Sequence, residues 1–111
     1  MPENILEKII KNKIAKIDIL KKSISILSLK EKTNENKSFI NFKEKIENNI
    51  KNDKISIIAE IKKRSPSAGI IIKDYNPVNI AKIYNNNNAT CLSVLTEEDF
   101  FLGNLIHIKK N

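Results

Sequence analysis

The feature that most constrains the fold is a pair of short apolar runs separated by a helical segment. Residues 55–61 are rich in β-branched side chains and almost wholly apolar, and residues 89–95 form a second run of this kind. Runs of this length are typical of strands buried on both faces, as in a parallel sheet. Between them, Asn76-Pro77 supplies a cap and a helix-compatible proline, and an asparagine tract at 85–88 ends the helix. The order predicts a right-handed βαβ unit in an α/β protein.

The first half of the chain has a helical pattern. Isoleucine and leucine residues between positions 5 and 27 recur on a 3.6-residue period and predict one helix that frays near the serines at 23–28. Residues 30–37 are all polar and predict a linker. A second helix is expected to begin at Ser38, which can cap it. Its expected apolar face consists of Phe39, Phe42, Ile46 and Ile50.

These patterns divide the chain into two regions. Residues 1–53 form an expected helical region that ends in an Asn-Asp turn. Residues 54–111 hold the expected βαβ unit and, after a loop at 96–103, the start of a further helix that Asn104 can cap.

Charge and cysteine content exclude several classes of function. The net charge of +7 is spread evenly, because residues 1–53 carry 12 basic and 8 acidic side chains and residues 54–111 carry 8 and 5. Without a basic block interleaved with aromatic residues, we expect no nucleic-acid partner. No run approaches the ~18 apolar residues of a membrane span, and the N-terminus lacks the apolar core of a signal peptide, so we expect a cytoplasmic protein with no membrane partner. Cys91 is the only cysteine, which predicts a small buried thiol and neither a disulfide nor a zinc cluster.

Glu60 is the residue most suggestive of chemistry. It interrupts the first apolar run near its C-terminal end, where α/β proteins bind ligands, and a carboxylate is costly to bury there unless it is paired or functional. Lys62 shares its parity, so both side chains would face one pocket and could handle protons and hold an anion. Two structural alternatives stay open: Glu60 could merely pair with a nearby lysine, and residues 62–64 could be solvated loop residues. His107 is expected to be an ordinary helix residue.

Three motifs then resemble one known family. Residues 58–69, residues 74–77 and residues 89–103 follow, in order and at the expected spacing, three signatures of indole-3-glycerol-phosphate synthase. The matching stretches read Ile58-Ala59-Glu60-Ile61-Lys62-Lys63-Arg64-Ser65-Pro66-Ser67-Ala68-Gly69, Asp74-Tyr75-Asn76-Pro77, Ala89-Thr90-Cys91-Leu92-Ser93-Val94-Leu95-Thr96-Glu97 and Phe100-Phe101-Leu102-Gly103. The opening at residues 4–9 is similar to the N-terminal helical extension of that family.

The resemblance implies a fold and a reaction. The fold would be the N-terminal helical extension and first βαβ unit of a TIM (β/α)8 barrel, incomplete because such a barrel usually needs about 250 residues. The family is a lyase of tryptophan biosynthesis. It closes a ring in a phosphorylated, anthranilate-derived substrate, 1-(2-carboxyphenylamino)-1-deoxyribulose 5-phosphate, with loss of carbon dioxide and then of water. It needs no metal and no organic cofactor.

The resemblance also implies residue roles. Glu60 would assist proton transfer and orient a catalytic lysine of the family's third strand, and Lys62 would contact the anionic groups of the substrate. The expected substrate-binding residues are Ser65 on the anthranilate side, Ser93 and Leu95 on the second strand, and Phe101 against the substrate ring.

We expect the 111-residue chain to be inactive alone, because it lacks the third-strand lysine and the later-strand glutamate of the family, and groups that act as a unit lose most of their effect when one is missing. We also expect it to be marginally stable or to associate, because a two-stranded parallel sheet has two open edges. The alternative to a catalytic N-terminal portion is a non-catalytic remnant or half of a split enzyme that docks to a complementary chain. A small basic nucleic-acid-binding module is a third hypothesis, which steeply salt-dependent binding would be needed to support.

Overall fold

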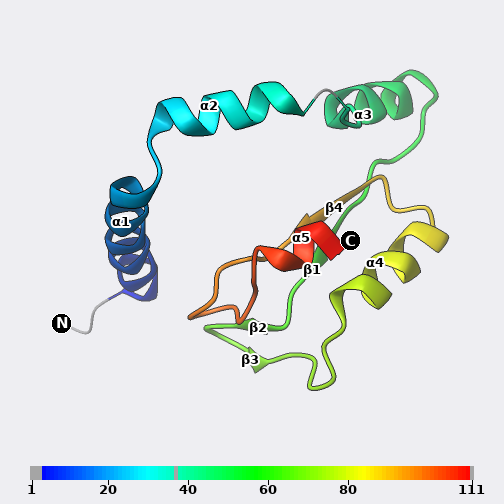
Figure 1. Ribbon diagram of the computed structural model, residues 1–111. Helices are drawn as coiled ribbons and strands as arrows, with labels where there is room; N and C mark the ends of the chain where they lie inside the picture. Colours follow the sequence, from blue (N-terminus) through cyan, green and yellow to red (C-terminus); the bar gives the residue numbers. More distant parts are fainter. Residues whose placement is uncertain (1–3, 37, 111) are drawn as a thin grey trace. The chain divides into compact units, whose positions relative to one another are not determined.

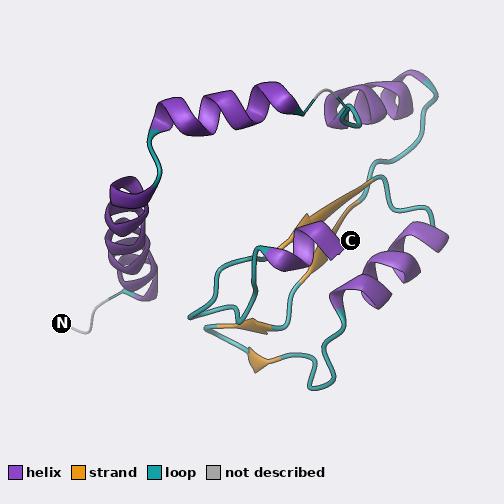
Figure 2. Cartoon of the chain, viewed as in Figure 1, coloured by secondary structure: helices purple, strands orange, loops and turns teal. Residues whose placement is uncertain are grey.

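The computed structural model describes residues 4–36 and 38–110, which form two compact units. The first unit is Met1–Ile40 and the second is Asn41–Asn111. The third helix of the chain, which the sequence pattern groups with the N-terminal helices, therefore belongs to the same unit as the strands. Figure 1 follows the chain through its elements, and Figure 2 distinguishes helices from strands.

The first unit contains two helices, α1 (Ile5–Ser23) and α2 (Ile26–Glu35). Asn4 caps α1 by accepting a hydrogen bond from the Leu6 amide at 2.9 Å, and Ser25 caps α2 by accepting one from the Ser28 amide at 3.1 Å. The break between them falls in the serine-rich stretch where fraying was expected. The prediction of a linker at 30–37 is wrong for residues 30–35, which are helical; residue 37 lies outside the described residues. Lysine and glutamate have high helix propensity, so an all-polar stretch with a good cap can continue as a helix.

The second unit begins with α3 (Phe42–Lys51), which starts later than predicted. Asn41, not Ser38, is the cap, and its side chain accepts a hydrogen bond from the Glu44 amide at 3.0 Å. Phe39 therefore precedes the helix, and 80% of its surface is exposed, so it is not part of the apolar face. The Asn-Asp turn after the helix is confirmed, with Asp53 at a φ of 53°.

The centre of the second unit is the predicted βαβ arrangement. Strand β1 (Ile58–Ile61) pairs in parallel with β4 (Cys91–Val94), and helix α4 (Pro77–Asn86) lies between them in the chain (Figure 1). Asn76 caps α4 as predicted, because its side chain accepts a hydrogen bond from the Asn79 amide at 3.1 Å. Both strands are shorter than the apolar runs that contain them.

The prediction that the strands are buried on both faces is wrong. In β1 the burial alternates: Ala59 and Ile61 are buried, whereas Ile58 and Glu60 are exposed. Helix α4 packs against β1 with Ala81 buried, so we assign the buried face of the strand to the helix side. The other face of β1 is not covered within the part of the chain that the structure describes. Apolar composition alone does not reveal which neighbours are present to bury a strand.

A small hairpin at residues 64–70 follows β1 in the chain. Strands β2 (Arg64–Ser65) and β3 (Gly69–Ile70) pair antiparallel. Gly69 has a φ of 69°, a conformation that glycine adopts without steric cost. The turn that follows β1 is therefore ordered by its own backbone pairing.

The last elements are the loop after β4 and the helix α5 (Ile106–Lys110). Asn104 accepts a hydrogen bond from the Ile106 amide at 3.0 Å, which confirms its expected capping role. Cys91, at the start of β4, is buried as predicted. No helix in the described ranges is both long and apolar enough to cross a membrane.

Candidate functional site

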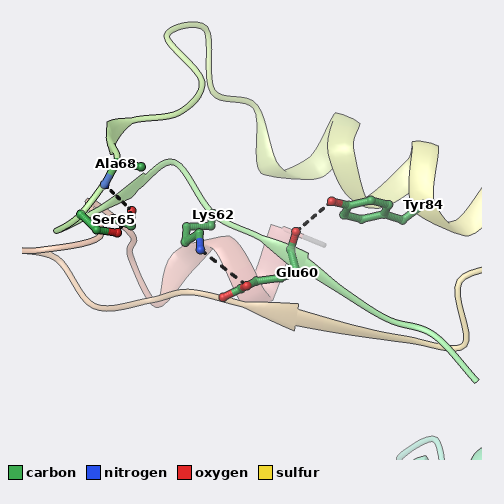
Figure 3. A network of polar contacts seen from close by, with 6 residues as sticks. Glu60, Lys62, Ser65, Ala68 and Tyr84 are labelled. Atoms are coloured by element: carbon green, nitrogen blue, oxygen red, sulfur yellow. Dashed lines mark hydrogen bonds and ion pairs between the residues drawn. The ribbon is translucent and has the colours of Figure 1, made fainter.

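Glu60 and Lys62 lie in direct contact at the C-terminal end of β1. The Lys62 Nζ is 3.7 Å from the Glu60 Oε2, and the two side chains point toward one another in Figure 3. The shared parity predicted for these residues is therefore confirmed. The Glu60 side chain is 48% exposed and that of Lys62 is 29% exposed, so the ion pair itself contributes only about 0.2–1 kcal/mol to stability. Because the fold depends little on this ion pair and both side chains are partly exposed, the two charged groups can also contact a ligand.

The strand register places two further predicted residues on the same side of the sheet. Glu60 is the partner of Ser93 in the parallel pair, and paired residues of neighbouring strands point to the same face. The Leu95 amide donates a hydrogen bond to the Ile61 carbonyl at 3.1 Å and continues the register beyond β4. Leu95 therefore shares parity with Ser93. The structure brings Glu60, Lys62, Ser93 and Leu95 to one face at the carboxyl ends of two parallel strands.

A pocket of about 160 Å³ lies beside the carboxylate–ammonium pair. Besides Glu60 and Lys62, its lining residues are Ile71, Ile72, Ile80 and Tyr84. It therefore combines one charged pair, apolar walls and a phenol. A larger hollow of about 540 Å³ surrounds Tyr75 and His107, but no carboxylate lines it. We place the candidate site at the Glu60–Lys62 end of β1 because the charged pair is there. The smaller pocket accounts for only part of it, because Ser65, Ser93, Leu95 and Phe101 are not among its lining residues.

Ser65 and Phe101 lie in the segments that follow the two strands. Ser65 is buried in β2, where its hydroxyl accepts a hydrogen bond from the Ala68 amide at 3.1 Å (Figure 3). The Ser65 hydroxyl also lies 3.5 Å from the Ser67 hydroxyl. Its hydroxyl is thus used to close the hairpin turn. Phe101 is partly exposed in the loop after β4. A substrate contact by either residue stays a prediction.

Glu97 organises the loop that carries Phe101. Its carboxylate accepts hydrogen bonds from the amides of Asp99 at 2.8 Å, Phe100 at 2.7 Å and Phe101 at 3.0 Å. Its carbonyl accepts a further hydrogen bond from the Gly103 amide at 2.8 Å. The motif at residues 89–103 contains this glutamate, but no role was predicted for it from the sequence.

Tyr84 is a second residue whose contact was not predicted. Its hydroxyl donates a hydrogen bond to the Glu60 carbonyl at 2.9 Å (Figure 3). The carbonyls of Ile57 and Ile61 accept hydrogen bonds from the β4 side, so the alternating carbonyl of Glu60 points to the opposite edge of β1. Tyr84 therefore satisfies an edge acceptor of the site strand. The sequence feature that could have predicted this contact is a tyrosine, with its polar hydroxyl, on a helix face that packs on a strand.

The Tyr75–His107 contact forms a separate aromatic pair. The centroids of the two rings are 5.7 Å apart and the rings meet edge to face, which confirms His107 as a packed helix residue. The Tyr75 hydroxyl and the His107 Nδ1 are buried without a hydrogen-bond partner among the described residues. Burial raises the pKa of the Tyr75 phenol above its ordinary value.

The described residues contain no group of three or more histidine, cysteine, aspartate or glutamate side chains placed to hold a metal ion. Operation without a metal or an organic cofactor stays a prediction.

Comparison with known proteins extends over nearly the whole chain. The family model described as indole-3-glycerol phosphate synthase matches residues 6–110. Three similar curated relatives carry that same name. The Trichodesmium erythraeum protein is 40% identical over 99% of this chain, the Clostridium acetobutylicum protein 45% over 95%, and a Legionella pneumophila protein 44% over 90%. The chain spans between 37% and 39% of the length of these relatives.

Proposed function

Because the chain belongs to the indole-3-glycerol-phosphate synthase family, we propose that it forms the first part of the active site of such a synthase, a carboxy-lyase of tryptophan biosynthesis. The proposed reaction is ring closure of 1-(2-carboxyphenylamino)-1-deoxyribulose 5-phosphate with loss of carbon dioxide and water. The proposed setting is a cytoplasmic enzyme that needs no cofactor.

The observation that carries the proposal is the contact between Glu60 and Lys62 at the end of β1. The Lys62 ammonium can bind the carboxylate or the phosphate of the substrate through a charge-assisted hydrogen bond. The Glu60 carboxylate can accept and return a proton and can orient a second ammonium group supplied by another strand. One anion-binding group and one proton-transfer group at adjacent positions suit a reaction in which an anionic substrate loses carbon dioxide and water.

The remaining site residues take supporting roles in this proposal. Ser93 and Leu95 share the face of Glu60 and would line the substrate cavity. Ser65 and Phe101, in the segments after the two strands, would border the anthranilate ring. The overall architecture proposed is an incomplete TIM barrel, with residues 1–53 as a helical extension and residues 54–111 as the first βαβ unit.

A second candidate function is docking without catalysis. The two-stranded sheet has no further paired strand within the described ranges, and Ile58 on its uncovered face is 53% exposed. An exposed apolar side chain beside an open strand edge is suited to pairing with another polypeptide. Under this reading the chain would be a remnant, or one half of a split enzyme, that binds a polypeptide supplying the other strands.

The test is to assay the chain with and without a barrel-completing polypeptide. This polypeptide would be the part of the Clostridium acetobutylicum relative that follows its region of similarity to this chain. The measured quantity is indole-3-glycerol phosphate formed from the synthetic substrate, with Glu60→Gln as the inactive control. We expect product only from the mixture, and much less of it with Glu60→Gln. A stable complex of the two polypeptides that forms no product would favour docking without catalysis. Product that forms equally well with Glu60→Gln would contradict the proposed site.

A further inference from the structure

We propose that Glu97 is a positioning residue, whose carboxylate holds the loop after β4 in the shape that presents Phe101 to the substrate. The inference rests on the proposed function, because it is that proposal which gives Phe101 a substrate to contact. It adds a role for a side chain that does not itself need to touch the substrate.

The Glu97 carboxylate accepts hydrogen bonds from three consecutive main-chain amides, those of residues 99–101. The Oε1 atom accepts from the Asp99 amide, and the Oε2 atom accepts from both the Phe100 and the Phe101 amides. Three successive amides therefore donate to one carboxylate, and hydrogen bonds to a carboxylate are stronger than those between neutral groups. The position of the Phe101 main chain is fixed relative to Glu97, and with it the point from which the phenyl ring departs.

The same loop is fixed at its other end by a close approach of the backbone. The Gly103 amide donates to the Glu97 carbonyl at 2.8 Å. A Cβ atom added to Gly103 would overlap the Leu95 carbonyl oxygen and would lie 2.9 Å from the Thr96 Cα. The loop therefore folds back against Leu95, which is itself on the proposed site face. In addition, the Arg64 Nη1 donates to the Asp99 carbonyl at 3.4 Å and connects the loop to the β2 strand.

Glutamine cannot reproduce these contacts. Its amide group keeps one acceptor oxygen and replaces the other with an N–H donor, which would face a backbone N–H. Glu97→Gln should therefore free at least one of the amides while nearly preserving the side-chain volume. Glu98 is the matched control, because it is an exposed glutamate at the next position.

The first experiment measures amide hydrogen exchange of the ¹⁵N-labelled full chain by NMR. We expect Glu97→Gln to accelerate exchange at one or more of the Asp99, Phe100 and Phe101 amides by at least about tenfold, as loss of a hydrogen bond to a charged group allows. Exchange at Leu95, which is bonded to β1, should be unchanged, and Glu98→Gln should change none of these rates. Unaltered rates at all three loop amides would overturn the proposal. Acceleration at Leu95 as large as in the loop would also overturn it, because Glu97 would then support the sheet in general.

The second experiment measures kcat and KM in the mixture with the barrel-completing polypeptide. We expect Glu97→Gln to raise KM by about tenfold with kcat changed by less than about twofold, because packing against the substrate ring acts mainly on binding. Equal KM values for Glu97→Gln and Glu98→Gln would overturn the positioning role. If the unsubstituted mixture forms no product, the proposed function fails, and the exchange data still decide whether Glu97 orders the loop.

Discussion

The two faces of β1 should respond very differently to the same substitution. Ile61 has 0% of its surface exposed, whereas Ile58, three residues earlier in the same strand, is 53% exposed. Replacing either with alanine removes the same atoms and the same strand propensity, so the difference reports the environment of each side chain. Ile61→Ala should lower the free energy of unfolding by about 2–5 kcal/mol, because the buried atoms that it removes no longer contribute their transfer free energy and a cavity is left behind. For Ile58, about half of the transfer term applies and no closed cavity forms, which gives about 1 kcal/mol.

The assay is urea unfolding of the full chain, followed by far-ultraviolet circular dichroism. An osmolyte such as TMAO can be added equally to all samples if the transition of the unsubstituted chain lies at low urea. With a slope near 1 kcal/mol per molar urea for a unit of this size, the midpoints of the two variants should differ by about 1–4 M. Equal midpoints would refute the assignment of the two faces. The cost of Ile58→Ala should also rise when the barrel-completing polypeptide is present, because the exposed face would then be covered.

Three further predictions concern single contacts. Tyr84→Phe removes the hydrogen bond to the Glu60 carbonyl and should lower the free energy of unfolding by about 0.5–1.5 kcal/mol in the urea assay; no change would show that water replaces the phenol at no cost. For Tyr75, the raised pKa means that the folded chain keeps a proton which the unfolded chain loses near pH 10, so stability should fall as the pH rises past this value. Tyr75→Phe should lessen that alkaline loss of stability, and an unchanged pH profile would contradict this. At neutral pH the same substitution should raise the free energy of unfolding by about 1 kcal/mol, because it removes a buried hydroxyl that has no hydrogen-bond partner in the described residues. Gly103→Ala should cost about 1–3 kcal/mol, since the new methyl group overlaps the Leu95 carbonyl, and an unchanged thermal midpoint would contradict the close approach.

The part of the site that depends on strand periodicity could be predicted from the sequence. The parity of Glu60 and Lys62 follows from the alternation of a strand, and the Glu60–Lys62 contact confirms it. The cap at Asn76 was also predictable, because an asparagine followed by proline has few other uses at the start of a helix.

The parts that failed depend on partners distant in the sequence or on weak local preferences. Burial on both faces of β1 was inferred from composition, but burial requires a neighbour, and only one face of β1 has one within the described part of the chain. The second part of α2, residues 30–35, was predicted as a linker because these residues are all polar, although lysine and glutamate have high helix propensity.

Two contacts of the site could not be predicted from the sequence because they depend on tertiary structure. The Tyr84 hydroxyl reaches Glu60 only when α4 is packed on the sheet, 24 positions away along the chain. The role of Glu97 depends on bends in the following residues that bring their amides back to its carboxylate. In both cases the sequence supplied the side chain and tertiary structure supplied the partner.

The most direct test of the proposed site compares two adjacent lysines. Lys62 pairs with Glu60, whereas Lys63 lies in the bend between β1 and β2, so Lys62→Ala and Lys63→Ala remove the same group from different positions. The measurement is kcat/KM for indole-3-glycerol phosphate formation in the mixture with the barrel-completing polypeptide. We expect Lys62→Ala to lower kcat/KM at least about 100-fold, equivalent to about 2.7 kcal/mol of lost transition-state stabilisation. Lys63→Ala should change it by less than about threefold. Equal effects of the two substitutions would contradict the assignment of the active site to this face of the sheet.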